Sequence, residues 1–141
     1  MQQLIEFAGN HMILVSLFAA ISVMLLWNLF GSAVSGIKQL SPAEVTRLMN
    51  RENAILLDVR NANDFKKGHI INSISIPNTE LAERQESLEK HKQKVVITYC
   101  EHGNLSDKAA RSLKASGFEQ VYSMKGGVMA WRSANLPLTK E

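Results

Sequence analysis

The chain has 141 residues, with sixteen Lys and Arg, thirteen Asp and Glu, and a single cysteine. One cysteine excludes an intrachain disulfide. The basic residues are scattered rather than gathered in one stripe, which argues against nucleic acid as a partner.

Charge is distributed unevenly along the sequence. Residues 1–37 contain no Lys or Arg and one acid, Glu6, so all sixteen bases and the other twelve acids lie beyond Ile37. This break predicts an N-terminal segment, residues 1–37, followed by one domain over residues 38–141 that is long enough to bury its own core. The small residues 31–36 suit a short tether between the two.

An uncharged stretch of nineteen residues covers residues 12–30. As a helix it would rise about 28 Å, close to the thickness of a hydrocarbon core. A helix of this kind tolerates Ser16, Ser22 and Asn28, and Trp27 suits a membrane interface. A cleavable signal peptide and a buried soluble helix are the alternatives, but no positive charge precedes the run. The sequence therefore predicts one N-terminal transmembrane helix that meets the lipid bilayer through residues 12–30.

Basic residues follow this stretch but do not precede it. Lys38, Arg47 and Arg51 lie beyond its C-terminal end, whereas the N-terminal flank offers only the α-amino group and His11 against Glu6. Because basic residues are retained on the cytoplasmic side, we expect a single-pass protein with its N-terminus outside and its domain in the cytoplasm. A lone cysteine agrees with that reducing compartment.

The domain alternates between predicted helices and strands. Ser41-Pro42-Ala43-Glu44 combines an N-cap, a proline at the first helical position and a capping-box acid, which predicts a helix that ends near Asn50. A short apolar run over 54–59 is typical of a strand buried on both faces. The remaining expected elements are a helical turn over 63–68, a short strand within 69–77, a helix over 79–90, a central strand over 95–99, a helix over 106–116, a strand over 118–124 and a final helix through Trp131. This alternation predicts an α/β fold with a mainly parallel sheet and helices on both faces.

Cys100 follows the central strand and begins the turn before the helix over 106–116. Ligands bind at the carboxyl ends of parallel strands, and loop amides together with a helix N-terminus favour a thiolate over a thiol. Gly103 can adopt the positive φ that such a loop usually needs. A lone cysteine can also be a small buried hydrophobe, but this position predicts a nucleophile.

Other polar residues have structural explanations. Asp58 and Arg60 bracket the end of a buried strand, and we expect them to pair and to order neighbouring loops rather than to react. His69 is expected to be a hydrogen-bonded structural histidine and Trp131 a core residue. No metal and no cofactor are expected, because the histidines show no ligand spacing with Cys100: His11, His69, His91 and His102.

Five motifs stand in order along the domain: Leu57-Asp58-Val59-Arg60, Asp64-Phe65-x-x-Gly68-His69-Ile70, Ser73-Ile74-x-Ile76-Pro77, the Cys100 loop, and Gly126-Gly127-x-x-Ala130-Trp131. Together they resemble the rhodanese homology domain over residues 38–138. With the anchor, the chain resembles the membrane-anchored, single-domain rhodanese-like proteins of the bacterial inner membrane. The resemblance implies a sulfurtransferase that takes sulfane sulfur from a donor such as thiosulfate, carries it as a persulfide of Cys100, and passes it to a thiophilic acceptor such as cyanide or a cellular thiol.

The resemblance also implies a role for each residue of the loop. Cys100 is the nucleophile, and the amides that follow it hold the terminal sulfur. The six positions from Cys100 to Leu105 match the loop of sulfurtransferases rather than the longer loop of dual-specificity phosphatases. The substrate-binding residues implied are Glu101, His102, Gly103, Asn104, Leu105 and Ser106.

Two loop positions depart from a common family pattern. A basic residue often follows the cysteine, and a basic or hydroxyl residue often closes the loop, whereas this chain has Glu101 and Leu105. We expect Glu101 to repel an anionic donor, so that thiosulfate turns over slowly. Within the loop, only His102 could offset that charge, if it is protonated.

Two other functions stay open from the sequence. The domain could be an adaptor for membrane-protein partners with an idle thiol, since the same fold serves several functions. It could also be a small thiol-dependent arsenate reductase or phosphatase. The intact loop favours the sulfurtransferase.

Overall fold

The computed structural model describes residues 1–34 and 36–141, without the side chains of residues 4, 5, 8 and 28–34. The chain divides into two compact units, Met1–Gly36 and Ile37–Glu141. Part of the predicted tether, residues 31–36, therefore lies outside the described residues.

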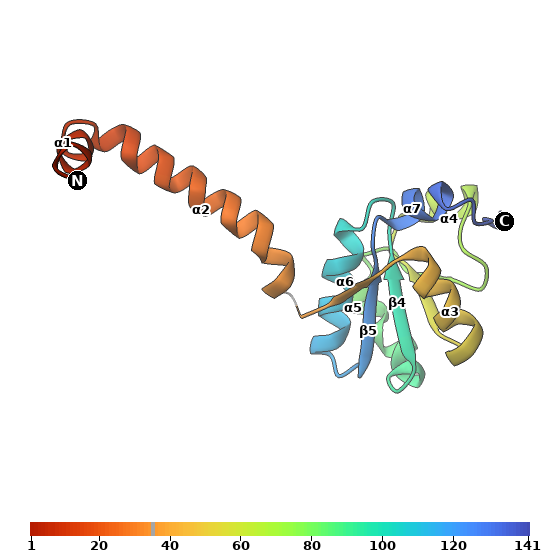
Figure 1. Ribbon diagram of the computed structural model, residues 1–141. Helices are drawn as coiled ribbons and strands as arrows, with labels where there is room; N and C mark the ends of the chain where they lie inside the picture. The colour runs from red at the N-terminus through yellow and green to blue at the C-terminus, as the bar shows by residue number, and fades with distance from the viewer. Residues whose placement is uncertain (35) are drawn as a thin grey trace. The chain divides into compact units, whose positions relative to one another are not determined.

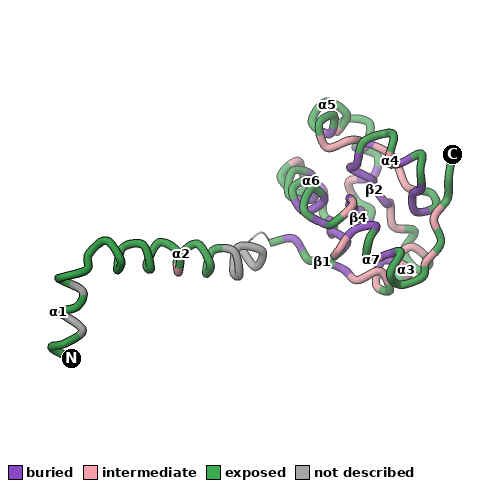
Figure 2. The backbone as a smooth tube through the Cα atoms, turned by 90° about the horizontal axis from the view of Figure 1, so that it is seen from above, coloured by how far each residue is buried: buried purple, intermediate pink, exposed green. Residues whose placement is uncertain are grey.

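The N-terminal unit consists of two helices, α1 (Gln2–Asn10) and α2 (Met12–Val34), of which the first was not predicted. The large apolar side chains of α2 from Met12 to Trp27 are exposed, and Figure 2 colours this part of the backbone mostly as exposed. Within the described part of the chain, no helix is both long enough and apolar enough to cross a membrane. The predicted span over 12–30 extends past the described side chains, and it stays a prediction.

The second unit is built on a five-stranded parallel sheet in the order β1-β5-β4-β2-β3, with β4 in the middle (Figure 1). This confirms the α/β class and the parallel sheet. The strands are β1 (Lys38–Leu40), β2 (Ile55–Asp58), β3 (Ile74–Ser75), β4 (Val95–Tyr99) and β5 (Gln120–Met124).

Helices cover both faces of this sheet, as predicted. One apolar cluster joins Leu57 and Val96 to Leu113, and the other joins Leu56 and Ile97 to other helices. Neighbouring residues of one strand point to opposite faces, so β2 and β4 contribute to both clusters. The helices are α3 (Pro42–Glu52), α4 (Ala62–Lys67), α5 (Leu81–Arg84), the 3₁₀ helix η1 (Gln85–His91), α6 (Asn104–Ala115) and α7 (Gly127–Ser133).

The start of α3 follows the predicted capping box. The Ser41 N–H donates to the Glu44 carboxylate at 2.8 Å, and the Glu44 N–H donates to Ser41 Oγ at 3.4 Å. The carboxylate accepts from the Ser41 N–H and also from the Ser41 hydroxyl at 2.9 Å, and these two hydrogen bonds, the backbone one above all, lower the pKa of Glu44. The helix therefore begins at Pro42, where the sequence placed its first helical residue.

Within the second unit, one strand was missed and one expected helix is divided. The three-residue edge strand β1 was missed, because its pairing with β5 comes from tertiary contact rather than from its own pattern. The short strand expected within 69–77 is β3, which is limited to Ile74–Ser75. The helix expected over 79–90 divides into α5 and η1, and near the break the Ser87 hydroxyl donates to the Arg84 carbonyl at 2.6 Å, which competes with regular helix hydrogen bonding.

The C-terminal tail bonds back to the segment after α4. The backbones of His69 and Thr139 exchange two hydrogen bonds of 2.8 Å, and Trp131 Nε1 donates to the Pro137 carbonyl at 3.0 Å. His69 also places Nδ1 at 2.9 Å from the Phe65 carbonyl and stacks on the Phe65 ring. His69 and the buried Trp131 thus have the structural roles expected of them.

Candidate active site

Cys100 lies directly after β4, at the carboxyl edge of the sheet, and its loop leads into α6. The backbone N–H groups of Gly103 and Ser106 donate to Cys100 Sγ at 3.0 and 3.4 Å. Gly103 has φ 103°, which lets the loop turn its amide inward. The cysteine is only 3% exposed, so these two amides and the N-terminus of α6 dominate the surroundings of the sulfur.

Buried hydroxyl groups connect the loop to strands β4 and β5. Ser106 Oγ lies 3.6 Å from Sγ, donates to the Gly103 carbonyl at 3.0 Å, and lies 3.0 Å from Ser123 Oγ on β5. Thr98 Oγ1, on β4, donates to the Ser106 carbonyl at 2.7 Å. Strands β4 and β5 thereby fix Ser106, whose N–H donates to Sγ.

The N-terminus of α7 holds the loop from the other side. The N–H groups of Val128 and Met129 donate to the carbonyls of Cys100 and Glu101 at 2.9 and 3.2 Å. A Cβ on Gly127 would lie 2.2 Å from the Cys100 carbonyl oxygen, so only glycine permits this approach. Because α7 binds the loop carbonyls, the loop amides stay directed toward the sulfur.

Asp58 and Arg60 form a buried ion pair beside the loop. Arg60 Nε lies 3.0 and 3.1 Å from the two Asp58 oxygens, and Nη2 donates to Asp58 at 2.6 Å and to the Gly68 carbonyl at 2.8 Å. Burial acts to lower the pKa of Arg60, but its hydrogen bonds to Asp58 and Glu101 and the Asp58 charge raise it overall. Arg60 thus stays charged while it holds Asp58 and the segment at Gly68.

Tyr99 completes the wall behind this pair. Its ring lies under the Arg60 guanidinium, 5.9 Å from centroid to Cζ, and its hydroxyl donates to Ser73 Oγ at 2.8 Å. Burial raises the pKa of Tyr99, and the nearby Asp58 charge raises it further. The phenol therefore remains a neutral donor and acceptor, which also accepts from the Ile70 N–H at 3.2 Å.

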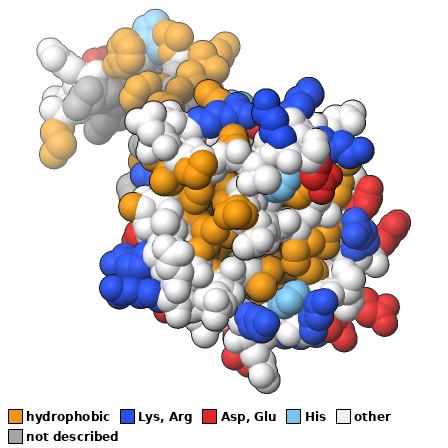
Figure 3. Space-filling model, turned by 90° about the vertical axis from the view of Figure 1, so that its right-hand side faces the viewer, with side chains coloured by type: hydrophobic (Ala, Val, Ile, Leu, Met, Phe, Trp, Pro, Cys, Tyr) orange, Lys and Arg blue, Asp and Glu red, His pale blue; other side chains and the backbone are white. Residues whose placement is uncertain are grey.

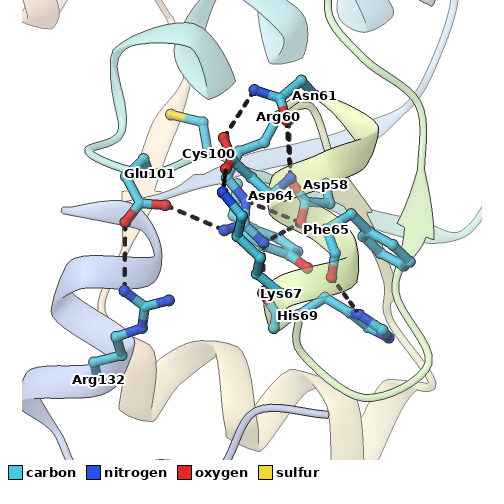
Figure 4. A network of polar contacts seen from close by, with 12 residues as sticks. Asp58, Arg60, Asn61, Asp64, Phe65, Lys67, His69, Cys100, Glu101 and Arg132 are labelled. Carbon is cyan, nitrogen blue, oxygen red and sulfur yellow. Dashed lines mark hydrogen bonds and ion pairs between the residues drawn. The ribbon is translucent and has the colours of Figure 1, made fainter. Parts of the chain in front are cut away.

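Glu101 points away from the sulfur and toward two arginines (Figure 4). Arg60 Nη1 lies 3.1 Å from one carboxylate oxygen, and Arg132 Nη1, on α7, lies 3.6 Å from the other. The expectation that only His102 could offset the Glu101 charge considered the loop alone, and it missed both arginines. Arg60 is 41 residues away in sequence, and nothing in the pattern around Arg132 marks it as a neighbour of the loop.

A hollow of about 450 Å³ opens over the loop. Of the predicted loop residues, Glu101, His102, Asn104 and Leu105 line it together with Cys100, whereas Gly103 and Ser106 are buried. The sequence analysis did not identify the part of the wall that follows β2 and β3. These segments lie at the same edge of the sheet as Cys100, so the rule that ligands bind at the carboxyl ends of parallel strands could have identified them. The further lining residues are Val59, Arg60, Asn61, Asp64, Pro77, Asn78 and Thr79.

The surface around the domain carries both signs of charge. On the face shown in Figure 3, Lys and Arg side chains alternate with Asp and Glu around the rim, and hydrophobic side chains gather toward the middle. Among the residues that the structure describes, no group of three or more His, Cys, Asp and Glu is placed to hold a metal ion.

Comparison with known proteins matches the rhodanese-like domain to residues 41–134. Among relatives, the "Uncharacterized protein YibN" of Escherichia coli strain K12 is 40% identical over 141 residues and covers 99% of both chains. The thiosulfate sulfurtransferase GlpE of Pseudoalteromonas translucida is 37% identical over 97 residues, which are 69% of this chain and 90% of that one.

Solved structures agree on the fold. The rhodanese-related protein of Thermoplasma volcanium superposes with a TM-score of 0.67 and is 30% identical, covering 74% of this chain and 99% of its own. The family match spans most of the second unit, from the residue that caps α3 to the end of α7. This chain therefore belongs to the rhodanese-like domain family, which includes thiosulfate sulfurtransferases.

Proposed function

We propose that this protein is a sulfurtransferase that carries sulfane sulfur as a persulfide on Cys100. The observation that carries the proposal is the pair of backbone N–H groups, from Gly103 and Ser106, directed at Sγ. The resemblance to thiosulfate sulfurtransferases supports the same reaction class.

In the first step the Cys100 thiolate attacks the sulfane sulfur of a donor. A bond forms between Sγ and that sulfur, the donor's S–S bond breaks, and the electron pair departs with the leaving group, which is sulfite when the donor is thiosulfate. In the second step an acceptor such as cyanide or a thiolate attacks the terminal sulfur, and Sγ leaves as the thiolate. Negative charge stays on sulfur throughout, where the loop amides and the α6 N-terminus stabilise it.

Intact mass after exposure to thiosulfate or polysulfide tests this proposal. The wild-type chain should gain one sulfur atom located at Cys100, and cyanide should remove it. Cys100→Ser should keep the fold and gain nothing, because serine is nearly isosteric and forms no stable persulfide. A wild-type chain that gains no sulfur from either donor would refute the enzyme and leave an adaptor for a membrane-protein partner.

The N-terminal segment is proposed to anchor the domain on the cytoplasmic side of a bacterial inner membrane. The support is the uncharged stretch over 12–30 and the Lys and Arg residues that occur only after it. A reporter fused after Glu141 should behave as cytoplasmic. Cleavage of the domain by protease added outside intact spheroplasts would overturn this topology.

A further inference from the structure

The one guanidinium in the lining of the pocket is already occupied. A guanidinium has five N–H donors, and Arg60 directs four of them at Asp58, the Gly68 carbonyl and Glu101. Its side chain is 4% exposed. Little of this cation is therefore left for a ligand, although it lies at the pocket wall.

The charges around the loop also cancel. Asp58 and Glu101 balance Arg60 and Arg132, and the second acid of the lining, Asp64, lies 3.5 Å from the exposed Lys67. Among the described lining residues, one is an arginine and two are acids. This arrangement offers no net attraction to a small dianion such as thiosulfate.

The rest of the wall is neutral. Apolar surface comes from Val59, Pro77 and Leu105, the last of which is 45% exposed, and side-chain amides come from Asn61 and Asn78. Apolar surface with a few amides suits an organic ligand with peptide-like groups better than a bare inorganic anion.

We infer that the sulfur donor is a persulfide on an organic thiol, R–S–SH, and that Glu101 sets this preference because it occupies both arginines; this rests on the proposed function. In the reaction the Cys100 thiolate attacks the terminal sulfur of R–S–SH. The new bond joins Sγ to that sulfur, which keeps its hydrogen. The S–S bond of the donor breaks, and the electron pair leaves with RS⁻.

The test compares two donors on the full chain: sodium thiosulfate, a dianion, and the persulfide of N-acetylcysteine amide, which has no ionisable group other than the persulfide itself. The rate of sulfur gain at Cys100 is followed by intact mass after alkylation. A persulfide is intrinsically more reactive than thiosulfate, so the informative quantity is the ratio of the two rates in each variant relative to wild type. Glu101→Gln should raise the thiosulfate-to-persulfide ratio about tenfold at low salt, and the rise should shrink at high salt.

Two further variants identify the cation. Glu101→Gln combined with Arg132→Gln should lose most of the rise, because Arg60 is still held by Asp58 and the Gly68 carbonyl and Arg132 is the arginine that the first substitution releases. Leu105→Arg, which adds a cation and keeps the Glu101 contacts, should raise the ratio as well. Glu119→Gln removes the same charge beside the amino end of β5, at the opposite edge of the sheet, and should leave the ratio at the wild-type value.

Each result is decisive. An unchanged ratio in Glu101→Gln would overturn the inference, whatever Leu105→Arg does, as would a wild-type chain that saturates with thiosulfate at lower concentrations than with the persulfide. Either outcome leaves the proposed function intact, since Cys100 still gains sulfur. If neither donor loads Cys100 in the wild type, the proposed function fails and the donor preference fails with it.

Discussion

The Cα of Gly127 approaches the backbone of Cys100 so closely that an added Cβ would lie 2.2 Å from the Cys100 carbonyl oxygen. The same Cβ would lie 2.6 Å from the carbonyl carbon of Glu101. Both groups are backbone, so neither can move without moving the loop. The start of α7 therefore sets the position of Cys100, although it contributes no side chain to the pocket lining described above.

Gly127→Ala should damage both stability and function. An alanine there would be strained by its φ of 58° and would also clash with the loop backbone. We therefore expect the free energy of unfolding to fall by about 3 kcal/mol and the rate of sulfur gain at Cys100 to fall at least about tenfold. Urea unfolding and intact mass measure the two effects. Gly117→Ala is the matched control, because φ is 95° there but a Cβ would meet nothing within 4 Å. It should cost about 1–2 kcal/mol without slowing sulfur gain, and equal effects on sulfur gain would contradict the assignment.

Asp58→Asn should destabilise the domain strongly. It leaves the buried Arg60 without its bidentate carboxylate, and breaking a buried pair in this way costs about 3 kcal/mol or more. The control is Glu80→Gln, which breaks the half-exposed pair with Arg84 at 3.4 Å. That pair is surface-exposed and should contribute about 0.5 kcal/mol or less. Similar urea midpoints for the two variants would mean that Asp58 is not a structural anchor.

Stability should fall as the solution becomes mildly acidic. Burial lowers the pKa of His91 below its ordinary 6.5, and the charges of Lys90 and Lys94 lower it further. At pH values just below 6.5 the unfolded chain therefore binds a proton at His91 more readily than the folded chain does. The free energy of unfolding consequently decreases as the pH drops below 6.5. Urea unfolding at about pH 7.5 and about pH 5.5 should show a smaller decrease for His91→Gln than for wild type. An identical decrease in both would exclude His91 as the cause.

The second unit should fold without the first. The strands, their covering helices and both apolar clusters lie within Ile37–Glu141. A chain that begins at Ile37 should therefore be soluble and unfold in one cooperative transition in urea, with intrinsic fluorescence and circular dichroism giving the same midpoint. Aggregation, or transitions that differ between the two probes, would indicate that the N-terminal helices complete the core.

Elements whose signals are local could be predicted from the sequence. The capping box at Ser41 and Glu44 sets the start of α3 through contacts three residues apart, and the buried run at Val95–Tyr99 becomes the central strand. The amides of Gly103 and Ser106 approach the thiol because the loop is short, which the sequence also indicates. By contrast β1 carries too few residues for any period to be visible, and only its neighbour β5 makes it a strand.

The charge balance of the site could not be predicted. Glu101 reads in sequence as an unpaired acid beside a nucleophile. Its partners come from the end of β2 and from α7, and they meet it only because β2 and β4 pair in parallel and α7 binds the loop. Contacts of this range depend on the register of the sheet, so the sign of the Glu101 effect is decided by tertiary structure.

The two hydrogen bonds between His69 and Thr139 decide where the chain can be extended or shortened. They hold the last residues against the segment that contains Gly68, whose carbonyl accepts a hydrogen bond from Arg60. The C-terminal tail therefore stabilises the wall of the pocket to which Arg60 belongs. A tag or reporter joined after Glu141 leaves these two hydrogen bonds in place. A deletion that removes Thr139 breaks them, and activity measured on such a shortened protein would describe a less ordered pocket rather than the native one.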